Sequence, residues 1–323
     1  MTLRDRLRDW WNGSDSYPPF QTSDYKNRLL EWWRGEKLPE SDANWALHAQ
    51  PPLRRAEAPH AKKQDIATRL IVSQALWGEG NLSPGPAEFI TNMMVLLRLT
   101  PEMSMLDLGA GLGGPSRAIN EAFGIWITAL EWEAEIAAAG MEQSIMHGMG
   151  RKVPVTHFDP ATTQNQVRKI DCFFSKDALH LIEDKYQILS AVKSAFKARG
   201  QFCILDFIVT DKGKDSPHIA AWNEADEHVS HFWTREQYGA AFKKLKLQLR
   251  SAEDKTGQYC EMIAEGFRKL TPCMHELVEA ETEAERKAGV LRALAFESNR
   301  WAVRAEALHS GDIAAFRFGG DTG

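Results

Sequence analysis

Residues 106–114 read Leu106-Asp107-Leu108-Gly109-Ala110-Gly111-Leu112-Gly113-Gly114, an apolar run that ends in a cluster of glycines. Glycines directly after a strand let the backbone turn sharply and approach a ligand, because they carry no Cβ atom. The spacing of three of them fits the pattern G-x-G-x-x-G of dinucleotide-binding proteins, so the glycines alone do not identify the nucleotide. The segment therefore predicts a strand followed by a nucleotide-binding loop.

Acidic residues at the ends of the first three predicted strands indicate which nucleotide this loop holds. Asp107 replaces the apolar residue usual in dinucleotide-binding proteins and could attract a cationic amino group. Glu131 ends the second strand and could accept both ribose hydroxyls. Phe158 and Asp159 close the third strand, where Asp159 could accept a hydrogen bond from an adenine amino group. Each carboxylate alone could be a solvated strand end, but together they favour S-adenosyl-L-methionine (SAM), because a pyrophosphate prefers helix N-terminal amides without adjacent carboxylates.

Short apolar runs alternate with helical patterns from about residue 61 onward. The clearest helix spans residues 185–199 before Gly200, and Thr234-Arg235-Glu236-Gln237 is a capping box that opens another. A long helical insertion, roughly residues 258–309, precedes the last strand. The strand candidates are 103–108, 125–130, 153–157, 170–174, 202–208, 247–250 and 310–318. This alternation predicts an α/β fold with a Rossmann-like, seven-stranded sheet.

Residues 1–60 form a Trp-rich segment that we expect to be a helical appendage to a domain spanning 61–323. The sequence Leu-Arg-Asp-Trp-Trp-Asn-Gly at 7–13 returns as Leu-Leu-Glu-Trp-Trp-Arg-Gly at 29–35, and each copy suits a short helix that a glycine ends. Paired tryptophans favour interfaces, so the segment could approach a membrane, dock a partner or mediate a homodimer. Basic and acidic residues balance there, which favours packing over membrane contact.

Composition argues against several other classes of protein. The chain has 323 residues, 43% of them hydrophobic, and a formal net charge of -5, which does not favour a nucleic-acid binder that relies on a positive field. No apolar run approaches the roughly 18 residues that span a bilayer, and the charged N-terminus does not resemble a signal peptide. The four cysteines lack metal-ligand spacing. We therefore expect a cytoplasmic protein.

The chain resembles small-molecule N-methyltransferases, among them the phosphoethanolamine and sarcosine/dimethylglycine enzymes, over roughly residues 64–262. The marks are Trp-Gly-Glu-Gly-Asn-Leu-Ser-Pro-Gly at 77–85, Ser-Lys-Asp-Ala-Leu-His at 175–180 and Leu-Asp-Phe at 205–207. The resemblance implies the class I fold of SAM-dependent methyltransferases. It implies cofactor contacts from Gln64, Leu82, Ser83 and Ser175, in addition to Asp107, Gly109, Gly111, Glu131, Phe158 and Asp159.

The same resemblance places Asp177 and His180 in the site of the methyl acceptor. An amine must be neutral to accept a methyl group, and a nearby histidine can take its proton, an effect of about 10²–10⁴-fold. Asp177 could hold the ammonium form and orient it. Asp65 stands where the phosphoethanolamine enzymes pair a tyrosine with the histidine, and is predicted to assist.

The substrate-binding positions depart from those of the phosphoethanolamine enzymes. Phe207, His228 and Ser230 stand where tyrosine and arginine would bind a phosphate, and a phosphate dianion needs charged or multiple donors. We therefore expect a small amine other than phosphoethanolamine, with contacts from Phe207, His228 and His231. Glu224, His228 and His231 could place three metal ligands on one helical face, but a substrate-lining helix is favoured and no metal is expected.

Two alternatives stay open at this point. The acceptor could be a hydroxyl, a thiol, an activated carbon or a lipid headgroup that the Trp-rich segment approaches at a membrane. A scaffold that binds SAM without turnover is the other alternative, against which the retained Asp177 and His180 argue. In either case, the apolar side of the helical insertion could roof the active site, through Leu277, Val290, Leu291 and Leu294.

Overall fold

The computed structural model describes residues 66–159 and 169–323. The predicted appendage at 1–60, and with it the proposed homodimer contact, lies outside the described residues. So do two residues of the predicted site, Gln64 and Asp65. The following description concerns the two described ranges.

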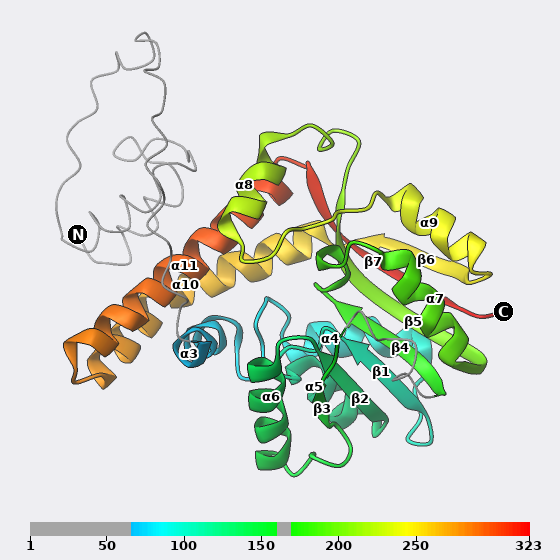
Figure 1. The fold of residues 1–323 in the computed structure, drawn as a ribbon, viewed down its shortest axis with the longest axis horizontal. Helices are drawn as coiled ribbons and strands as arrows, with labels where there is room; N and C mark the ends of the chain where they lie inside the picture. Colours follow the sequence, from blue (N-terminus) through cyan, green and yellow to red (C-terminus); the bar gives the residue numbers. More distant parts are fainter. Residues whose placement is uncertain (1–65, 160–168) are drawn as a thin grey trace, which may run out of the picture. The chain divides into compact units, whose positions relative to one another are not determined.

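A mixed sheet of seven strands organises the described part of the chain (Figure 1). The strand order is β3-β2-β1-β4-β5-β7-β6, in which β1 to β5 run parallel to one another and β7 runs antiparallel to β5 and β6. Because the order reverses between β1 and β4, a crevice opens beyond the carboxyl ends of these two strands. The bounds are β1 Ser104–Leu108, β2 Trp126–Glu131, β3 Val155–His157, β4 Ile170–Lys176, β5 Phe196–Val209, β6 Gln248–Asp254 and β7 Ile313–Asp321. The predicted seven-stranded Rossmann-like sheet is confirmed.

Three of the helices described below begin at a residue whose side chain accepts a hydrogen bond from a backbone amide of the first turn: Asp184, Ser216 and Thr234. The Thr234 side chain accepts a hydrogen bond from the Gln237 amide, and the Gln237 side chain returns one to the Thr234 amide, so the predicted capping box is confirmed. The helices are α3 Ile66–Trp77, α4 Ala87–Met94, α5 Gly114–Phe123, α6 Ala134–Met146, α7 Lys185–Ala195, α8 Pro217–Ala225, α9 Arg235–Lys244, α10 Thr256–Ala280 and α11 Ala284–His309; two 3-10 turns are η3 Val95–Leu97 and η5 Leu179–Leu181.

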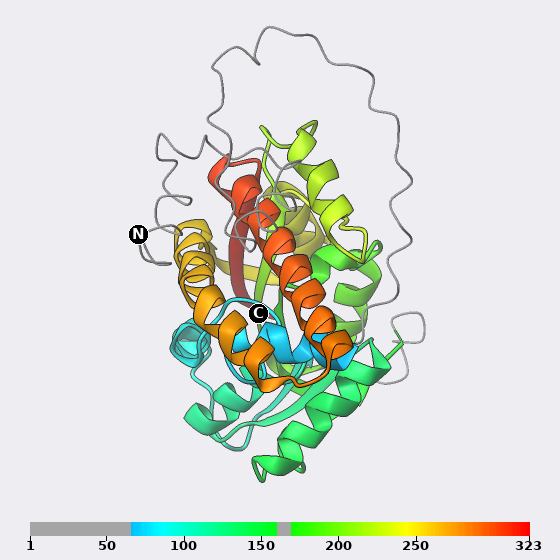
Figure 2. The same ribbon diagram turned by 90° about the vertical axis from the view of Figure 1, so that its left-hand side faces the viewer.

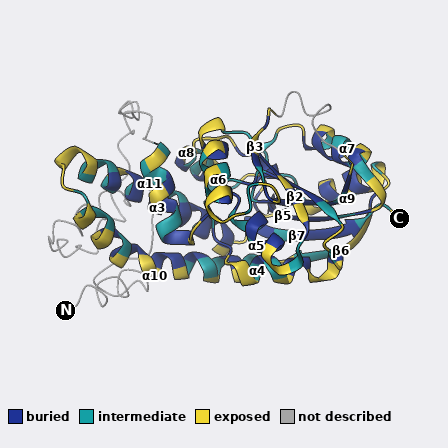
Figure 3. Cartoon of the chain, turned by 90° about the horizontal axis from the view of Figure 1, so that it is seen from below, coloured by how far each residue is buried: buried dark blue, intermediate teal, exposed yellow. Residues whose placement is uncertain are grey.

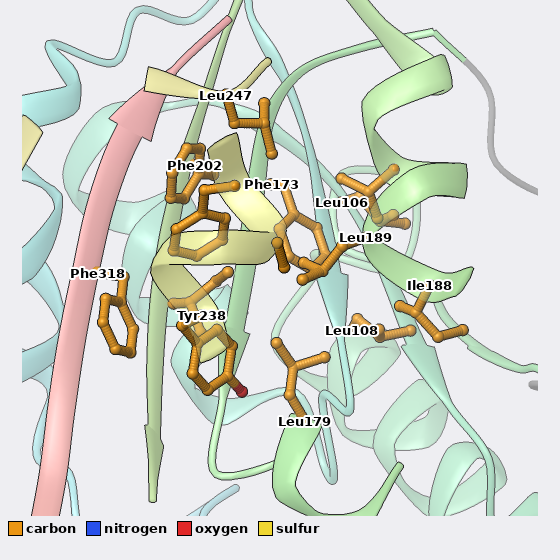
Figure 4. Packing of buried hydrophobic residues seen from close by; sticks show 14 of the residues in the cluster. Leu106, Leu108, Phe173, Leu179, Ile188, Leu189, Phe202, Tyr238, Leu247 and Phe318 are labelled. Atoms are coloured by element: carbon orange, nitrogen blue, oxygen red, sulfur yellow. The ribbon is translucent and has the colours of Figure 1, made fainter. Parts of the chain in front are cut away.

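Strand alternation sends successive side chains of the sheet into two different layers. On one face, Leu106 and Phe202 join the main hydrophobic core, which α7 and α9 cover (Figure 4). On the other face, Asp107 contacts Ser116 of α5, and Cys203 contacts the carbonyl oxygen of Met93 in α4. Asp107 therefore interrupts the apolar pattern of β1 on the face that the glycine loop turns toward, away from the main core.

The helix predicted over 185–199 ends four residues early, at Ala195. Phe196 pairs instead with Ile170 and begins β5, and the Lys197 ammonium contacts the Asp171 carboxylate at 2.6 Å. The helical spacing continues into Phe196 because its ring packs on the same core as α7. Pairing with β4, a long-range contact that local periodicity does not contain, ends the helix there.

The helical face proposed for three metal ligands is also wrong. Helix α8 ends at Ala225, so His228 and His231 lie in the segment that follows it. The Asp226 backbone is extended, because its carboxylate is held by Arg300 and Arg304 of α11. Within the two described ranges, no group of three or more His, Cys, Asp or Glu residues could hold a metal ion.

The predicted helical insertion is a pair of long helices, α10 and α11, that lie side by side (Figure 2). Val290 and Leu294 are buried, whereas Leu277 and Leu291 are half-buried. Exposed residues gather at the turn that joins the end of α10 to the start of α11 (Figure 3). Helix α11 also packs on α3 and α8, which brings its C-terminal half to the rim of the sheet. No helix that the structure describes has the length and apolar character needed to cross a membrane.

Candidate functional site

One pocket lies at the carboxyl ends of β1, β2 and β4, where the sheet topology predicts a ligand. Helices α3 and α11 and the segment after α8 complete its wall. The pocket brings together eight of the residues predicted from the sequence: Leu82, Ser83, Asp107, Gly109, Gly111, Glu131, Asp177 and His228. Their convergence from five separate segments makes this pocket the candidate site.

The glycine loop is shaped by a tight contact with the end of β4. Gly109 has a φ of 77°, and a Cβ atom built on it would lie 2.2 Å from the Cβ of Ala178. Gly111 has a φ of 57° and faces the Leu82 side chain. Glycine is required at the first position by both conformation and space. The motif at 77–85 lies against this loop, because the Gly114 amide donates to the carbonyl oxygen of Gly80 at 3.0 Å.

Glu131 ties the glycine loop to the end of β2. Its Oε2 accepts a hydrogen bond from the Gly111 amide at 2.8 Å, and its Oε1 accepts one from the Glu133 amide at 3.0 Å. The side chain is buried, and burial raises its pKa, while these backbone donors lower it. A carboxylate held in this way faces the pocket with fixed lone pairs, which suits acceptance of hydrogen bonds from a pair of hydroxyls.

Asp107 is a buried carboxylate whose charge is easily lost. Its Oδ2 accepts a hydrogen bond from the Ser116 hydroxyl at 2.7 Å. Burial raises the pKa of Asp107 to about 7, and the nearby Glu131 carboxylate adds to the shift, against the opposing effects of Ser116 and Lys176. A cation placed in the pocket would stabilise the ionised form of Asp107.

Asp177 stands on the same pocket wall with one oxygen occupied and one unpaired. Its Oδ2 accepts hydrogen bonds from Ser83 Oγ at 2.7 Å, from Lys176 Nζ and from Tyr259 Oη. Its Oδ1 is buried and has no hydrogen-bond partner among the described residues. The backbone at Asp177 is left-handed, with φ 54°, and its amide donates to the carbonyl oxygen of Leu205 at 2.9 Å. The unpaired oxygen can therefore accept a hydrogen bond from a ligand.

His180 lies outside the residues that line the pocket. Its side chain is 1% exposed, and its Nδ1 lies 2.8 Å from Oδ1 of Asp206, whose Oδ2 accepts a hydrogen bond from Tyr238. The imidazole stacks on the Phe232 ring at 5.9 Å, and Nε2 is buried without a partner among the described residues. The structure therefore does not bring His180 together with Asp177 Oδ1 at the pocket wall.

The other predicted site residues occupy positions around the pocket. Phe158 is in the main core, and Phe207 packs on the rings of Trp222 and Tyr259. None of the following five lies among the described lining residues: Phe158, Asp159, Ser175, Phe207 and His231. Ser175 Oγ instead donates to the carbonyl oxygen of Leu108, the His231 amide donates to the carbonyl oxygen of His180, and Asp159 is exposed.

Sequence reasoning missed the basic side chains that line the pocket. These are Lys176, which belongs to the motif at 175–180, and Arg69, Arg300 and Arg304, which belong to no motif of the sequence. One signal was present: on α11, Glu297 and Arg304 share the buried face with apolar residues at helical spacing, namely Val290, Leu294, Trp301 and Leu308. Charged residues on a buried helical face usually have partners or a ligand.

Comparison with known proteins identifies the fold. No protein-family model matches the chain. Phosphoethanolamine N-methyltransferase 1 of Zea mays is 25% identical over 204 residues, which are 63% of this chain and 40% of that protein. The glycine/sarcosine/dimethylglycine N-methyltransferase of Actinopolyspora halophila is 25% identical over 116 residues, or 36% of this chain and 20% of that protein. The chain thus spans less than half the length of these relatives.

Solved structures of methyltransferases have a similar fold to this chain. Phosphoethanolamine N-methyltransferase 2 of Haemonchus contortus superposes with a TM-score of 0.66 at 18% identity, over 80% of this chain and 58% of that one. A sarcosine dimethylglycine methyltransferase from Galdieria sulphuraria gives a TM-score of 0.60 at 17% identity, over 79% of this chain and 98% of that one. The fold is that of the class I methyltransferases. In this chain, the glycine loop and the acids at the ends of β1 and β2 line the candidate pocket.

Proposed function

We propose that the chain is a SAM-dependent methyltransferase that methylates the nitrogen of a small molecule. The observation that carries the proposal is the convergence of Asp107, Glu131 and the two loop glycines on one pocket that Asp177 also lines, with its Oδ1 buried and without a hydrogen-bond partner among the described residues. The proposal is supported by the names of the relatives, which are N-methyltransferases of phosphoethanolamine and of glycine, sarcosine and dimethylglycine.

The pocket residues fit SAM by the chemistry of their donors and acceptors. SAM supplies a methyl group activated on a sulfonium. In the proposed complex, Glu131 accepts hydrogen bonds from the ribose hydroxyls, Asp107 attracts the ammonium of the methionine part, and Leu82 covers the ligand beside Gly111. Glu131 is 4% and Asp107 2% exposed, so both interactions form away from bulk water.

The chain's contribution to the transfer is to position the amine, exclude water and accept a proton. The nitrogen lone pair forms the new N–C bond while the S–C bond breaks, and the proton that nitrogen loses passes to a nearby base. Placing the two groups in line is the main source of acceleration in such a reaction. Asp177 is suited to orient the amine and to take its proton, because His180, the proton acceptor proposed from the sequence, is buried against Asp206 and does not line the pocket.

SAM affinity is expected to fall as the pH is lowered through about 7. The raised pKa of Asp107 means that its carboxylate is ionised above that pH and neutral below it. Only the ionised form attracts the ammonium, so binding at pH 6 is expected to be about tenfold weaker than at pH 8. Calorimetric titration across this range measures the effect. Asp107→Asn is expected to bind weakly at every pH; a wild-type affinity that does not change with pH contradicts the assignment.

The acceptor is tested by S-adenosylhomocysteine release from SAM with a panel of amines, thiols, hydroxy acids and phospholipid headgroups. The panel includes phosphoethanolamine, which the sequence predicted not to be the acceptor and which the names of the relatives favour. Turnover on an amine supports the proposal. Asp177→Asn and His180→Ala separate the two candidate proton acceptors, because the variant that lacks the acceptor is expected to lose about 10²-fold or more in kcat. Turnover only on a thiol, hydroxyl or lipid would overturn N-methylation.

A further inference from the structure

Three arginines from two helices form one wall of the pocket. Arg69 comes from α3, and Arg300 and Arg304 come from successive turns of α11. We call these three residues the arginine wall. Arg69 and Arg300 are 12% and 13% exposed and Arg304 is 3% exposed, so all three guanidinium groups are largely removed from water. Burying three like charges side by side is costly unless anions compensate them.

The buried acids near the arginine wall compensate only part of its charge. Asp226 lies 3.3 Å from Arg300 Nε and also pairs with Arg304, and Glu297 lies 3.4 Å from Arg69 Nε and 3.6 Å from Arg300 Nη1. The two carboxylates are 2% and 0% exposed and are not among the described residues that line the pocket. Two buried carboxylates therefore stand behind three guanidinium groups.

A third acid near the wall, Glu227, compensates its charge only weakly. It pairs with Arg69, but its side chain is 38% exposed, so water screens its charge. Glu133 is engaged with His228, whose Nε2 lies 3.1 Å from its Oε1. All three arginines are therefore paired with carboxylates, but a guanidinium has five N–H donors, more than these pairs use, so the wall keeps hydrogen-bond donors for a ligand.

Arg304 is fixed by its neighbours, and one of its N–H groups has no hydrogen-bond partner among the described residues. Its guanidinium lies over the rings of Trp222 and Trp301, at 4.8 Å and 4.6 Å from their centroids. Its Nε is buried and has no hydrogen-bond partner among the described residues. Burial lowers the pKa of Arg304, and the neighbouring Arg300 lowers it further, so the two cations repel each other. A ligand anion would relieve this repulsion.

We propose that the arginine wall is an anion subsite that binds a carboxylate or phosphate of the methyl acceptor. The acceptor's amino group would then meet Asp177 Oδ1 in the same pocket, so the wall selects amines that also carry an anionic group. Guanidinium forks match carboxylate and phosphate oxygens in pairs, which a lone histidine does not. The identity of the acceptor rests on the proposed methyltransferase function; anion binding by the wall does not.

The subsite corrects an expectation drawn from the sequence. Phe207, His228 and Ser230 were judged too poor in charged donors to hold a phosphate, and the first and last of these do not line the pocket. Two of the three charged donors, Arg300 and Arg304, come from α11, in the helical insertion beyond the stretch that resembles the N-methyltransferases, and Arg69 of α3 lies within that stretch. An anionic acceptor is therefore compatible with the changed positions.

The test compares amines that differ only in an anionic group, on the full chain. Glycine is paired with methylamine, and phosphoethanolamine with ethanolamine, which separates a carboxylate from a phosphate. In the wild type, one anionic member is expected to have a kcat/KM at least about 30-fold above that of its neutral partner. Arg300→Gln is expected to reduce this ratio about tenfold or more through KM. Arg292→Gln, on the same helix and 59% exposed, is the matched control and should leave the ratio unchanged.

Anion binding is also measured without turnover. Inorganic phosphate and acetate are titrated into the protein, with and without S-adenosylhomocysteine, and one of them is expected to bind at least tenfold more weakly to Arg300→Gln than to Arg292→Gln. Equal binding of both anions by the two variants would overturn the subsite. A preference of the wild type for neutral amines would also overturn the subsite. So would a loss of S-adenosylhomocysteine affinity in Arg300→Gln as large as its loss of anion affinity, because that result would assign the wall to the cofactor's carboxylate. Failure of S-adenosylhomocysteine to bind the wild type would overturn the proposed function while the anion titration still reports on the wall.

Discussion

Gly109→Ala is expected to destabilise the protein by about 2–5 kcal/mol and to abolish SAM binding. The new methyl group would lie 2.2 Å from the Cβ of Ala178 and 3.0 Å from the Trp132 ring, so the loop must move away from the end of β4. A left-handed alanine costs about 1–2 kcal/mol, and overpacking adds about 1–3 kcal/mol. Thermal unfolding with and without SAM measures both effects, and a drop of roughly 5–15 °C in melting temperature is expected.

Gly148→Ala is the matched control for this substitution. Gly148 has a φ of 70°, close to that of Gly109, but no described atom lies within 4 Å of a Cβ built on it. This variant therefore loses only the cost of a left-handed alanine, about 1–2 kcal/mol of the free energy of unfolding, and should keep full affinity for SAM. If the two variants lose the same stability and both still bind SAM, the close packing of the glycine loop against Ala178 plays no part in ligand binding.

Glu131→Gln is expected to weaken SAM binding by at least about 30-fold. A hydrogen bond to a charged acceptor contributes about 1.5–3 kcal/mol, and the carboxylate is placed to receive two from the ribose. The amide keeps one acceptor oxygen and the shape of the side chain, so the glycine loop can stay folded. Calorimetric titration with S-adenosylhomocysteine gives the affinity, and the melting temperature reports on the fold.

Glu135→Gln serves as the control for charge. Glu135 is an exposed residue in the first turn of α6, four residues beyond Glu131, and does not line the pocket. It is expected to change affinity by less than about twofold. A Glu131→Gln variant that binds as tightly as this control would show that the end of β2 does not hold the ribose.

The fold could be predicted from the sequence because its signals are local. A strand that is buried on both faces is a short apolar run, and a glycine cluster after it marks the turn to a ligand-binding loop. The same logic placed Asp107 and Glu131 at one sheet edge, since parallel strands present their carboxyl ends together. The structure confirms the sheet and brings both carboxylates to the pocket.

The rest of the site depends on contacts between distant segments, which periodicity does not contain. Tyr259 of α10 reaches Asp177, 82 residues away in the sequence, and Arg304 reaches Asp226 from α11. The short turn at 179–181 carries the His180 imidazole back toward Asp206 rather than toward the pocket. Its spacing from Asp177 along the chain could not reveal this direction.

The most direct test of the account is a calorimetric titration of the wild-type chain with SAM and, separately, with NAD⁺. The two ligands correspond to the two interpretations that the glycine pattern allows, and the acids at the ends of β1 and β2 decide between them. The account predicts saturable binding of SAM with a dissociation constant of order micromolar, about -8 kcal/mol, and no binding of NAD⁺ at the same concentrations. Binding of NAD⁺ without binding of SAM would contradict it.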